Sequence, residues 1–352
     1  MKQGLGKQLD LTALLKAQRG AVMGLSALLI LFFHCWVPTV AEFPVIGTIE
    51  TVLKGYGYLS VDVFFLLSGV GMTYALRGNG SVRQFYARRL KRVYLPFLEG
   101  VILAALTKGW TLGETFSRLT GLNLLLTGIY AHLWFVQIIL MIYLAYPLLH
   151  RLLEKSRKDV ALMGAIVAAV FGLTVLFGGH VPKIYRGLCY RISTFLVGVW
   201  IGRAEQKKRL TCSLWQYLLF LAGMALLFWG SGRVLKATGM LAAKMVYSAA
   251  LSICFAYAIA GLCQAICSLR HRVFAPLRWG VAILALCGTF TLEVYELQGF
   301  YWVFVNPLEG KLTYLQINLL VLVLLPSIAY LISRLNQRII SCFDKAGQEG
   351  NR

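Results

Sequence analysis

The chain has little charge for its length, and this scarcity excludes the commonest class of protein. Only 14% of its 352 residues are charged, whereas about a quarter of the residues are charged in ordinary soluble domains. Hydrophobic residues make up 59% of the chain, and the mean hydropathy is +0.70. A soluble globular protein is therefore excluded, and we expect no soluble domain attached to the apolar part.

Cysteine motifs and internal repeats are also missing. The eight cysteines mostly lie in or beside apolar runs, and none forms a Cys-x-x-Cys pair, so we expect no disulfide framework and no metal site. The N-terminus lacks the short apolar segment and cleavage site of a secreted precursor, so the first apolar run should be retained. We find no repeat and no broken helix of the kind that inverted-repeat transporters carry.

What the chain has instead is a series of long apolar runs between residues 21 and 333. They predict an all-α fold, a polytopic transmembrane helix bundle of about ten spans. The expected spans are residues 21–37, 58–76, 94–107, 132–149, 160–177, 188–202, 214–230, 245–267, 281–304 and 313–333. We expect one transmembrane domain over residues 21–334, with a basic leader over 1–20 and a tail over 335–352.

The basic residues predict the orientation of these spans. Most of the 35 Lys and Arg residues lie in alternate connecting segments, all on one side of a ten-span arrangement. The positive-inside rule therefore places both termini in the cytoplasm. The net charge of +21 is explained by this topology, so the expected partner is a lipid bilayer and not a nucleic acid. The pattern carries no information on oligomeric state.

The apolar stretch 55–74 contains a carboxylate and a cluster of small residues: Asp62, Ser68, Gly69 and Gly71. A carboxylate within the bilayer costs ~2.5–3.5 kcal/mol on insertion scales, so it requires a partner or a task. Asp62 and Gly69 are seven residues apart and share a helix face. That face is either a helix-packing surface with a paired aspartate, or a functional face where another backbone or a slim ligand chain approaches Ser68 and Gly69.

His34 lies at the extracytoplasmic end of the first expected span, at the expected depth of Asp62. An imidazole held by a carboxylate is a good general base. Alone, His34 can be interpreted as a helix-end residue near lipid headgroups. Paired with Asp62, it predicts a catalytic site.

Arginines cluster between the second and third spans, in the segment FYARRLKRVYLP. Arg88, Arg89 and Arg92 are spaced to lie along one flank of a short helix. Such a cluster either binds anionic headgroups and sets topology, or binds a phosphorylated ligand through its guanidinium groups.

Two further segments combine polar and aromatic residues near the expected outer surface. His132 and Trp134 begin the fourth span, where an aromatic belt is the simpler interpretation of Trp134. In the ninth span, Tyr295 and Gln298 share one helix face, and Glu293 and Glu296 share another. Two carboxylates within one apolar run are difficult to explain by packing.

Together these segments resemble the acyltransferase 3 family of bacterial membrane enzymes, which acylate sugars and cell-envelope glycans. The resemblance covers nearly the whole chain. The matching segments, in order, are LFFH ending at residue 34, SVDVFFLLSG at 60–69, FYARRLKRVYLP at 85–96, HLWF at 132–135, and GTFTLEVYELQ at 288–298.

The resemblance implies a multi-pass enzyme of the cell membrane that transfers an acyl group, usually acetyl, from cytoplasmic acyl-CoA to a hydroxyl group of a carbohydrate acceptor. It implies no permanently bound cofactor, since acetyl-CoA is the donor substrate. On this sequence, His34 looks like the family's catalytic residue, and Arg88, Arg89 and Arg92 look like its basic motif for the CoA phosphates. Our hypothesis from the residues adds that Asp62 orients His34 and that the pantetheine arm runs past Ser68, Gly69 and Gly71.

Three departures from the family pattern concern activity. Met23 stands where the family usually has an arginine eleven residues before the histidine, with Arg19 one turn earlier. Gln298 stands where the ninth-span motif usually ends in histidine, and Glu296 stands where that motif usually has a leucine. If the family's second histidine shuttles protons, Glu296 would take over that role here. The expected site therefore includes His132, Trp134, Glu293, Tyr295, Glu296 and Gln298 around the acceptor. The alternatives are a transporter or flippase with a proton path through the buried acids, and a catalytically silent family member.

Overall fold

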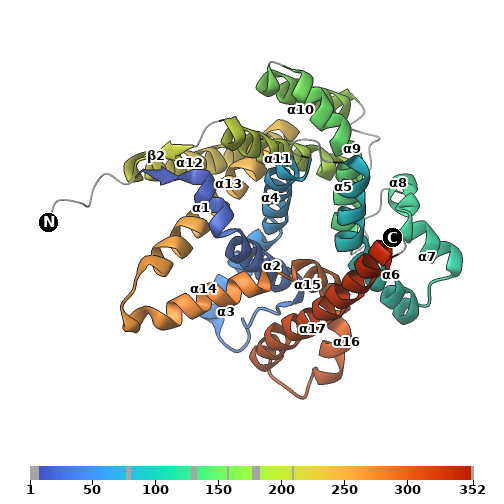
Figure 1. The fold of residues 1–352 in the computed structure, drawn as a ribbon. Helices are drawn as coiled ribbons and strands as arrows, with labels where there is room; N and C mark the ends of the chain where they lie inside the picture. The colour runs from blue at the N-terminus through green and yellow to red at the C-terminus, as the bar shows by residue number, and fades with distance from the viewer. Residues whose placement is uncertain are drawn as a thin grey trace. The chain divides into compact units, whose positions relative to one another are not determined.

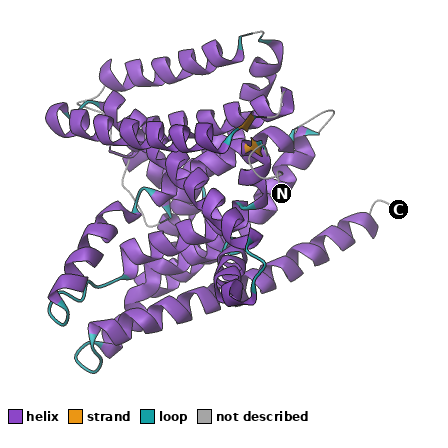
Figure 2. Ribbon diagram, turned by 90° about the vertical axis from the view of Figure 1, so that its left-hand side faces the viewer, coloured by secondary structure: helices purple, strands orange, loops and turns teal. Residues whose placement is uncertain are grey.

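The structure is a computed structural model that describes residues 8–76, 81–127, 133–156, 158–176, 183–207 and 210–349. Within these ranges nearly every element is a helix, as Figure 2 shows. The strands described are one antiparallel pair of two residues each, Leu9–Asp10 (β1) and Thr211–Cys212 (β2). The all-α prediction is confirmed.

A helix occurs at each expected span, and further helices occur before the first span, between spans and within the expected ninth span. Those at the expected spans are α2 (Arg19–Cys35), α4 (Ser60–Ala75), α6 (Leu95–Lys108), α9 (Trp134–Lys155), α10 (Asp159–Leu176), α11 (Lys183–Lys207), α12 (Leu214–Thr238), α13 (Leu241–Ser268), α14 (Ala275–Cys287) and α17 (Tyr314–Glu349). The additional helices are α1 (Leu11–Ala17), α3 (Pro44–Gly57), α5 (Val82–Arg89), α7 (Leu112–Leu119), α8 (Leu122–Thr127), α15 (Thr291–Leu297) and α16 (Tyr301–Val305).

The lengths and composition of these helices make the chain a multi-pass membrane protein. In the part of the chain that the structure describes, five helices are long and apolar enough to cross a membrane, or up to seven if each of two bent helix pairs forms one span. One bent pair is α1 and α2, which meet at 61°. The total of about ten spans remains a prediction from the apolar runs, and the cytoplasmic position of both termini remains a prediction from the charge pattern.

The expected ninth span, 281–304, is wrong as a continuous helix. α14 ends at Cys287, α15 begins at Thr291, and a 3₁₀ turn at Gln298–Phe300 separates α15 from α16. The break begins at Gly288, which has low helix propensity. It also lies against another backbone: a Cβ on Gly288 would be 2.1 Å from the carbonyl oxygen of Gly20. Hydropathy alone does not register such a break, because both halves are apolar.

The described chain divides into two compact units whose segments alternate along the sequence. Unit 1 consists of residues 1–26, 59–82 and 141–288, and unit 2 consists of residues 27–58, 83–140 and 289–352. α2 and α9 each contribute residues to both units.

Unit 1 is built around α4, α11 and α13, which pack on one another (Figure 1). Glycines bring α4 and α11 into backbone contact: a Cβ on Gly69 would lie 2.1 Å from the carbonyl oxygen of Phe195, and one on Gly198 would lie 2.1 Å from that of Leu66. Such a close approach is characteristic of small residues between membrane helices. Leu66 and Leu67 are fully buried beside this contact.

A glycine substitution tests this contact. Gly198→Ala is expected to lower the stability of the protein by roughly 1–3 kcal/mol, the usual cost of overpacking. Gly164→Ala in α10 is the matched control, because nothing lies within 4 Å of its Cβ position, and alanine there should be neutral or stabilising by up to about 1 kcal/mol. Thermal unfolding of the purified variants in detergent gives the difference, and equal midpoints would contradict the backbone contact.

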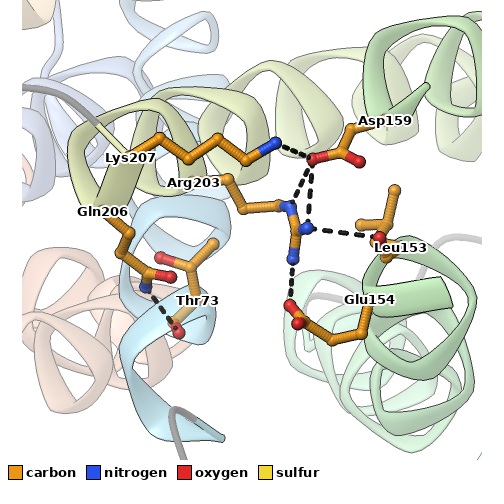
Figure 3. Close-up of polar contacts among 7 residues, drawn as sticks. All are labelled: Thr73, Leu153, Glu154, Asp159, Arg203, Gln206 and Lys207. Atoms are coloured by element: carbon orange, nitrogen blue, oxygen red, sulfur yellow. Dashed lines mark hydrogen bonds and ion pairs between the residues drawn. The ribbon is translucent and has the colours of Figure 1, made fainter. Parts of the chain in front are cut away.

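Ionic contacts join the ends of α9, α10 and α11 in unit 1 (Figure 3). The guanidinium of Arg203 contacts Glu154 at 2.6 Å and Asp159 at 3.0 Å, and Lys207 contacts Asp159 at 2.8 Å. The same turn of α11 also bonds to α4, because the side-chain amide of Gln206 donates to the carbonyl oxygen of Thr73 at 3.0 Å. These contacts tie α9, α10 and α4 to the C-terminal part of α11 within unit 1.

In unit 2, α15 packs against α6 and α17 (Figure 1). The turn after α2 is fixed by side chains: Asn318 of α17 donates to the carbonyl oxygen of Val37 and accepts from its amide. From α3, the ammonium of Lys54 donates to the carbonyl oxygen of Trp36. Helix α3 was not expected, because Glu50, Lys54 and its glycines interrupt the apolar pattern.

Candidate functional site

His34 is the penultimate residue of α2, and its side chain is exposed. The ring of Phe33 meets the imidazole edge to face, with 4.7 Å between the ring centroids. Lys54 of α3 is near enough to act electrostatically on the imidazole. The sequence interpretation missed this cation. The signal for it is weak, since Lys54 lies between the first two expected spans.

Asp62 lies in the first turn of α4 and is only 1% exposed. Its carboxylate has a cationic partner in unit 1, because Nε of Arg191 lies 3.3 Å from its Oδ1. Arg191 is itself 4% exposed and also donates to the carbonyl oxygen of Gly187 at 3.1 Å. Lys244 and Ser248 of α13 act on the same carboxylate. The aspartate is therefore paired within unit 1, as one of the two sequence interpretations required.

Arg191 is the second residue that sequence reasoning missed. The available signal was a basic residue inside an apolar run, since charged residues within membrane segments usually pair with one another. The proposed contact between His34 and Asp62 remains a prediction, because the two residues belong to different units.

The arginine cluster lies where α5 joins α6 in unit 2. Arg88 and Arg89 end α5, and Arg92 lies in a π-helical turn, Leu90–Tyr94, that continues directly into α6. Arg88 and Arg92 are exposed, while the Arg89 guanidinium lies 5.9 Å from the centroid of the Phe85 ring. The π turn changes the angular spacing that a straight α-helix would give. Turns of this kind are frequent at functional sites.

The structure selects between the two interpretations of the small-residue face at Gly69. The backbone of α11 packs on this glycine. The space left by the missing side chain of Gly69 is therefore filled by a helix and not by a ligand chain. Ser68 remains half-buried, and Tyr143 of α9 donates to its hydroxyl group at 3.5 Å. Nη2 of Arg19 would lie 3.4 Å from a Cβ on Gly71, so this arginine reaches α4 within unit 1.

α15 places two carboxyl groups in the interior of unit 2. Glu293 and Glu296 are 7% and 5% exposed. The carboxyl of Glu296 lies over Gly100 of α6, where a Cβ would approach it to 3.4 Å. Glu99, the neighbour of Gly100, accepts a hydrogen bond from the amide of Asn336 in α17 at 3.0 Å. The two predicted acids thus meet a third one, and neither Glu99 nor Asn336 was among the predicted site residues.

The same helix contacts two other predicted motifs. The hydroxyl of Tyr295 accepts from the backbone amide of Phe135 at 3.2 Å, and the two rings meet with their centroids 5.4 Å apart. The thiol of Cys35, next to His34, donates to the carbonyl oxygen of Gln298 at 3.7 Å. α15 and the turn after it therefore lie beside the end of α2, the start of α9 and α6, all within unit 2.

The remaining predicted residues are less informative. Trp134 begins α9 and lies beside Phe135, with 6.3 Å between ring centroids, whereas His132 lies outside the described residues. Met23 packs against the core of unit 1. Among the described residues, no group of three or more His, Cys, Asp or Glu side chains is arranged to hold a metal ion.

These features define a class of protein: a multi-pass helical membrane protein with a histidine, an arginine cluster and buried carboxyl groups carried by its apolar helices. A family model described as an acyltransferase domain matches residues 22–334, nearly the whole chain, and the chain therefore belongs to the acyltransferase 3 family. Comparisons with curated proteins and with solved structures gave no match.

Proposed function

We propose that the protein is an O-acyltransferase of the cell membrane that moves an acyl group, usually acetyl, from cytoplasmic acyl-CoA to a hydroxyl group of an extracytoplasmic sugar or envelope glycan. One observation carries the proposal beyond family membership. Unit 2 gathers the helix end with His34, the exposed arginine cluster, and the polar segment of α15. A base and a phosphate-binding cluster are the two parts that this reaction requires.

The proposed chemistry uses His34 as the general base, with Asp62 orienting the imidazole. The imidazole takes the proton of the acceptor hydroxyl, and the oxygen attacks the thioester carbonyl. The C–S bond then breaks, and the CoA thiolate leaves and takes up a proton. In the other route the acyl group passes first to His34 and then to the acceptor. Both routes begin from a neutral imidazole, whose free nitrogen accepts the proton or the acyl group.

The proposed donor site is the arginine cluster. CoA carries several phosphate groups, and guanidinium groups bind phosphate oxygens in a bidentate manner. Arg88 and Arg92 are exposed and so are free to contact a soluble donor. Ser68 is retained as a contact of the pantetheine arm, whereas the packing of α11 on Gly69 removes that glycine from the proposal.

The Arg88→Gln/Arg92→Gln variant tests the donor site. Each lost charge-assisted hydrogen bond is worth ~1.5–3 kcal/mol, so the apparent KM for acetyl-CoA should rise at least tenfold, with a smaller change in kcat. Arg334→Gln/Arg338→Gln is the matched control, because these two arginines are also exposed and four residues apart, on α17. An unchanged KM in the first variant would mean that the arginine cluster only sets the membrane topology and does not bind the donor.

The broken helix favours one alternative, which is a transporter. Discontinuous helices that carry acidic residues are typical of transporter binding sites, and the break between α14 and α15 lies next to Glu293. The discriminating experiment measures transfer or hydrolysis of labelled acetyl-CoA by the purified protein in detergent. Turnover of the thioester supports the enzyme. CoA binding without turnover would indicate a silent family member, for which Met23 and Gln298 are the residues to revert.

A further inference from the structure

Three carboxyl groups of unit 2, one serine and one asparagine form a cluster with more hydrogen-bond acceptors than donors. Glu293 and Glu296 come from α15, Glu99 from α6, and Ser333 and Asn336 from α17. The donors are the backbone N–H of Glu293 and the Ser333 hydroxyl, which hydrogen-bond the Glu293 carboxyl, and the Asn336 amide, which bonds both Glu293 and Glu99. Three ionised carboxylates would present acceptors alone.

Two buried oxygens in this cluster have no hydrogen-bond partner among the residues that the structure describes. They are Oε1 of Glu296 and Oδ1 of Asn336, whose residues are 5% and 3% exposed. A buried acceptor without a donor costs ~1–3 kcal/mol. The shortage of donors does not depend on how the Asn336 amide is oriented. Rotating the amide by 180° would turn its oxygen toward the Glu99 carboxyl and place two acceptors against each other there. The described part of the cluster therefore lacks at least one donor.

The surrounding charges do not supply this donor. The charged groups that act on Glu296 are Glu293 on its own helix and Glu99 from α6, and both have the same sign as Glu296. α17 contributes the neutral Ser333 and Asn336, and none of the described groups that act on these carboxyls is a cation. Carboxylates that share a buried site do not all ionise, because each charge raises the energy of the next.

We infer that Glu99, Glu293, Glu296 and Asn336 form a proton-binding site, in which at least one carboxyl group stays protonated at neutral pH. The O–H of that group is the missing donor. The Gly100 backbone leaves the space in which the Glu296 carboxyl lies. A proton store would serve acyl transfer, which moves a proton from an acceptor hydroxyl to a leaving thiolate. That role rests on the proposed function, whereas the site itself does not.

Infrared spectroscopy of the purified protein in lipid, titrated with pH in the absence of any acyl donor, tests the site. A carbonyl band of protonated carboxyl groups is expected at pH 7, with a shift in heavy water that marks an exchangeable proton. Glu296→Gln, which conserves shape, should weaken or shift this band. Glu309→Gln is the control, because Glu309 is exposed in the same unit, and this variant should leave the band unchanged.

A second variant is expected to increase the infrared band of protonated carboxyl groups. Asn336→Asp places a fourth carboxyl group in the cluster, and the neutral-pH band should grow because the added group has no cation to stabilise its charge. Absence of the band at pH 7 in the wild-type protein would overturn the inference, and would mean that all three carboxylates are ionised, with or without a bound cation. An identical band in Gln variants at positions 99, 293 and 296 would also overturn it, by assigning the proton elsewhere.

Discussion

Replacing His34 with alanine is expected to abolish nearly all acyl transfer while the protein still inserts and folds. A general base contributes roughly 10²–10⁴-fold to a rate, and an acyl carrier would contribute at least as much. The side chain is exposed at the end of α2, so its removal leaves little packing defect. Turnover of acetyl-CoA by purified protein, with size-exclusion behaviour and thermal unfolding as the check on folding, measures the effect.

The control for this experiment is His271→Ala, which removes another exposed histidine and should leave transfer unchanged. Asp62→Asn adds the test of pairing. If the aspartate acts through His34, the double variant should be scarcely slower than His34→Ala alone, because residues that act as a unit are strongly non-additive. Well-folded His34→Ala protein with wild-type transfer would refute the mechanism, and independent effects of the two substitutions would refute the pairing.

Replacing Arg191 with methionine is expected to cause the largest loss of stability. Removing one member of a buried ion pair costs roughly 3–5 kcal/mol, since the remaining charge stays buried. Here the remaining charge is the Asp62 carboxylate, which is 1% exposed. The midpoint of thermal or denaturant unfolding in detergent should fall accordingly. Arg233→Met is the matched control, because Arg233 is exposed on α12 of the same unit.

The double variant Asp62→Asn/Arg191→Met separates the ion pair from other effects of the methionine. A neutral asparagine has no charge to compensate, so the double variant should recover most of the lost stability. A double variant as unstable as Arg191→Met would show that Arg191 stabilises unit 1 through other contacts, such as its bond to the Gly187 carbonyl oxygen.

Long apolar runs were sufficient to predict that a helix lies at each expected span, because a backbone in hydrocarbon must satisfy its own hydrogen bonds. They were insufficient at Gly288, where the break in the ninth span depends on contact with the Gly20 backbone. α7 could have been predicted, because Thr111 and Glu114 form a capping box whose spacing is visible in the sequence. α3 could not, since its apolar face is interrupted.

The composition of the candidate site was only partly accessible from sequence. Asp62, Glu293 and Glu296 were noticeable because carboxylates are rare in apolar runs. Their partners Arg191 and Asn336 come from helices distant in sequence, and an asparagine in α17 carries no signal of its own. The small residues around Gly69 fitted either a helix-packing face or a ligand-binding face. Only the position of α11 distinguishes these two interpretations.

The alternation of the two units along the chain also constrains how the protein is made. The Glu99 carboxyl and the Asn336 amide that bonds it are 237 residues apart. At ~5–20 residues per second, the ribosome needs roughly 12–47 s to cover that distance. During that time Glu99 lacks the hydrogen bond from Asn336. α6 must therefore remain at the translocon or at the bilayer surface, or enter the lipid with a neutral Glu99 carboxyl. Slow translation downstream of α6 should therefore lower the yield of correctly inserted protein.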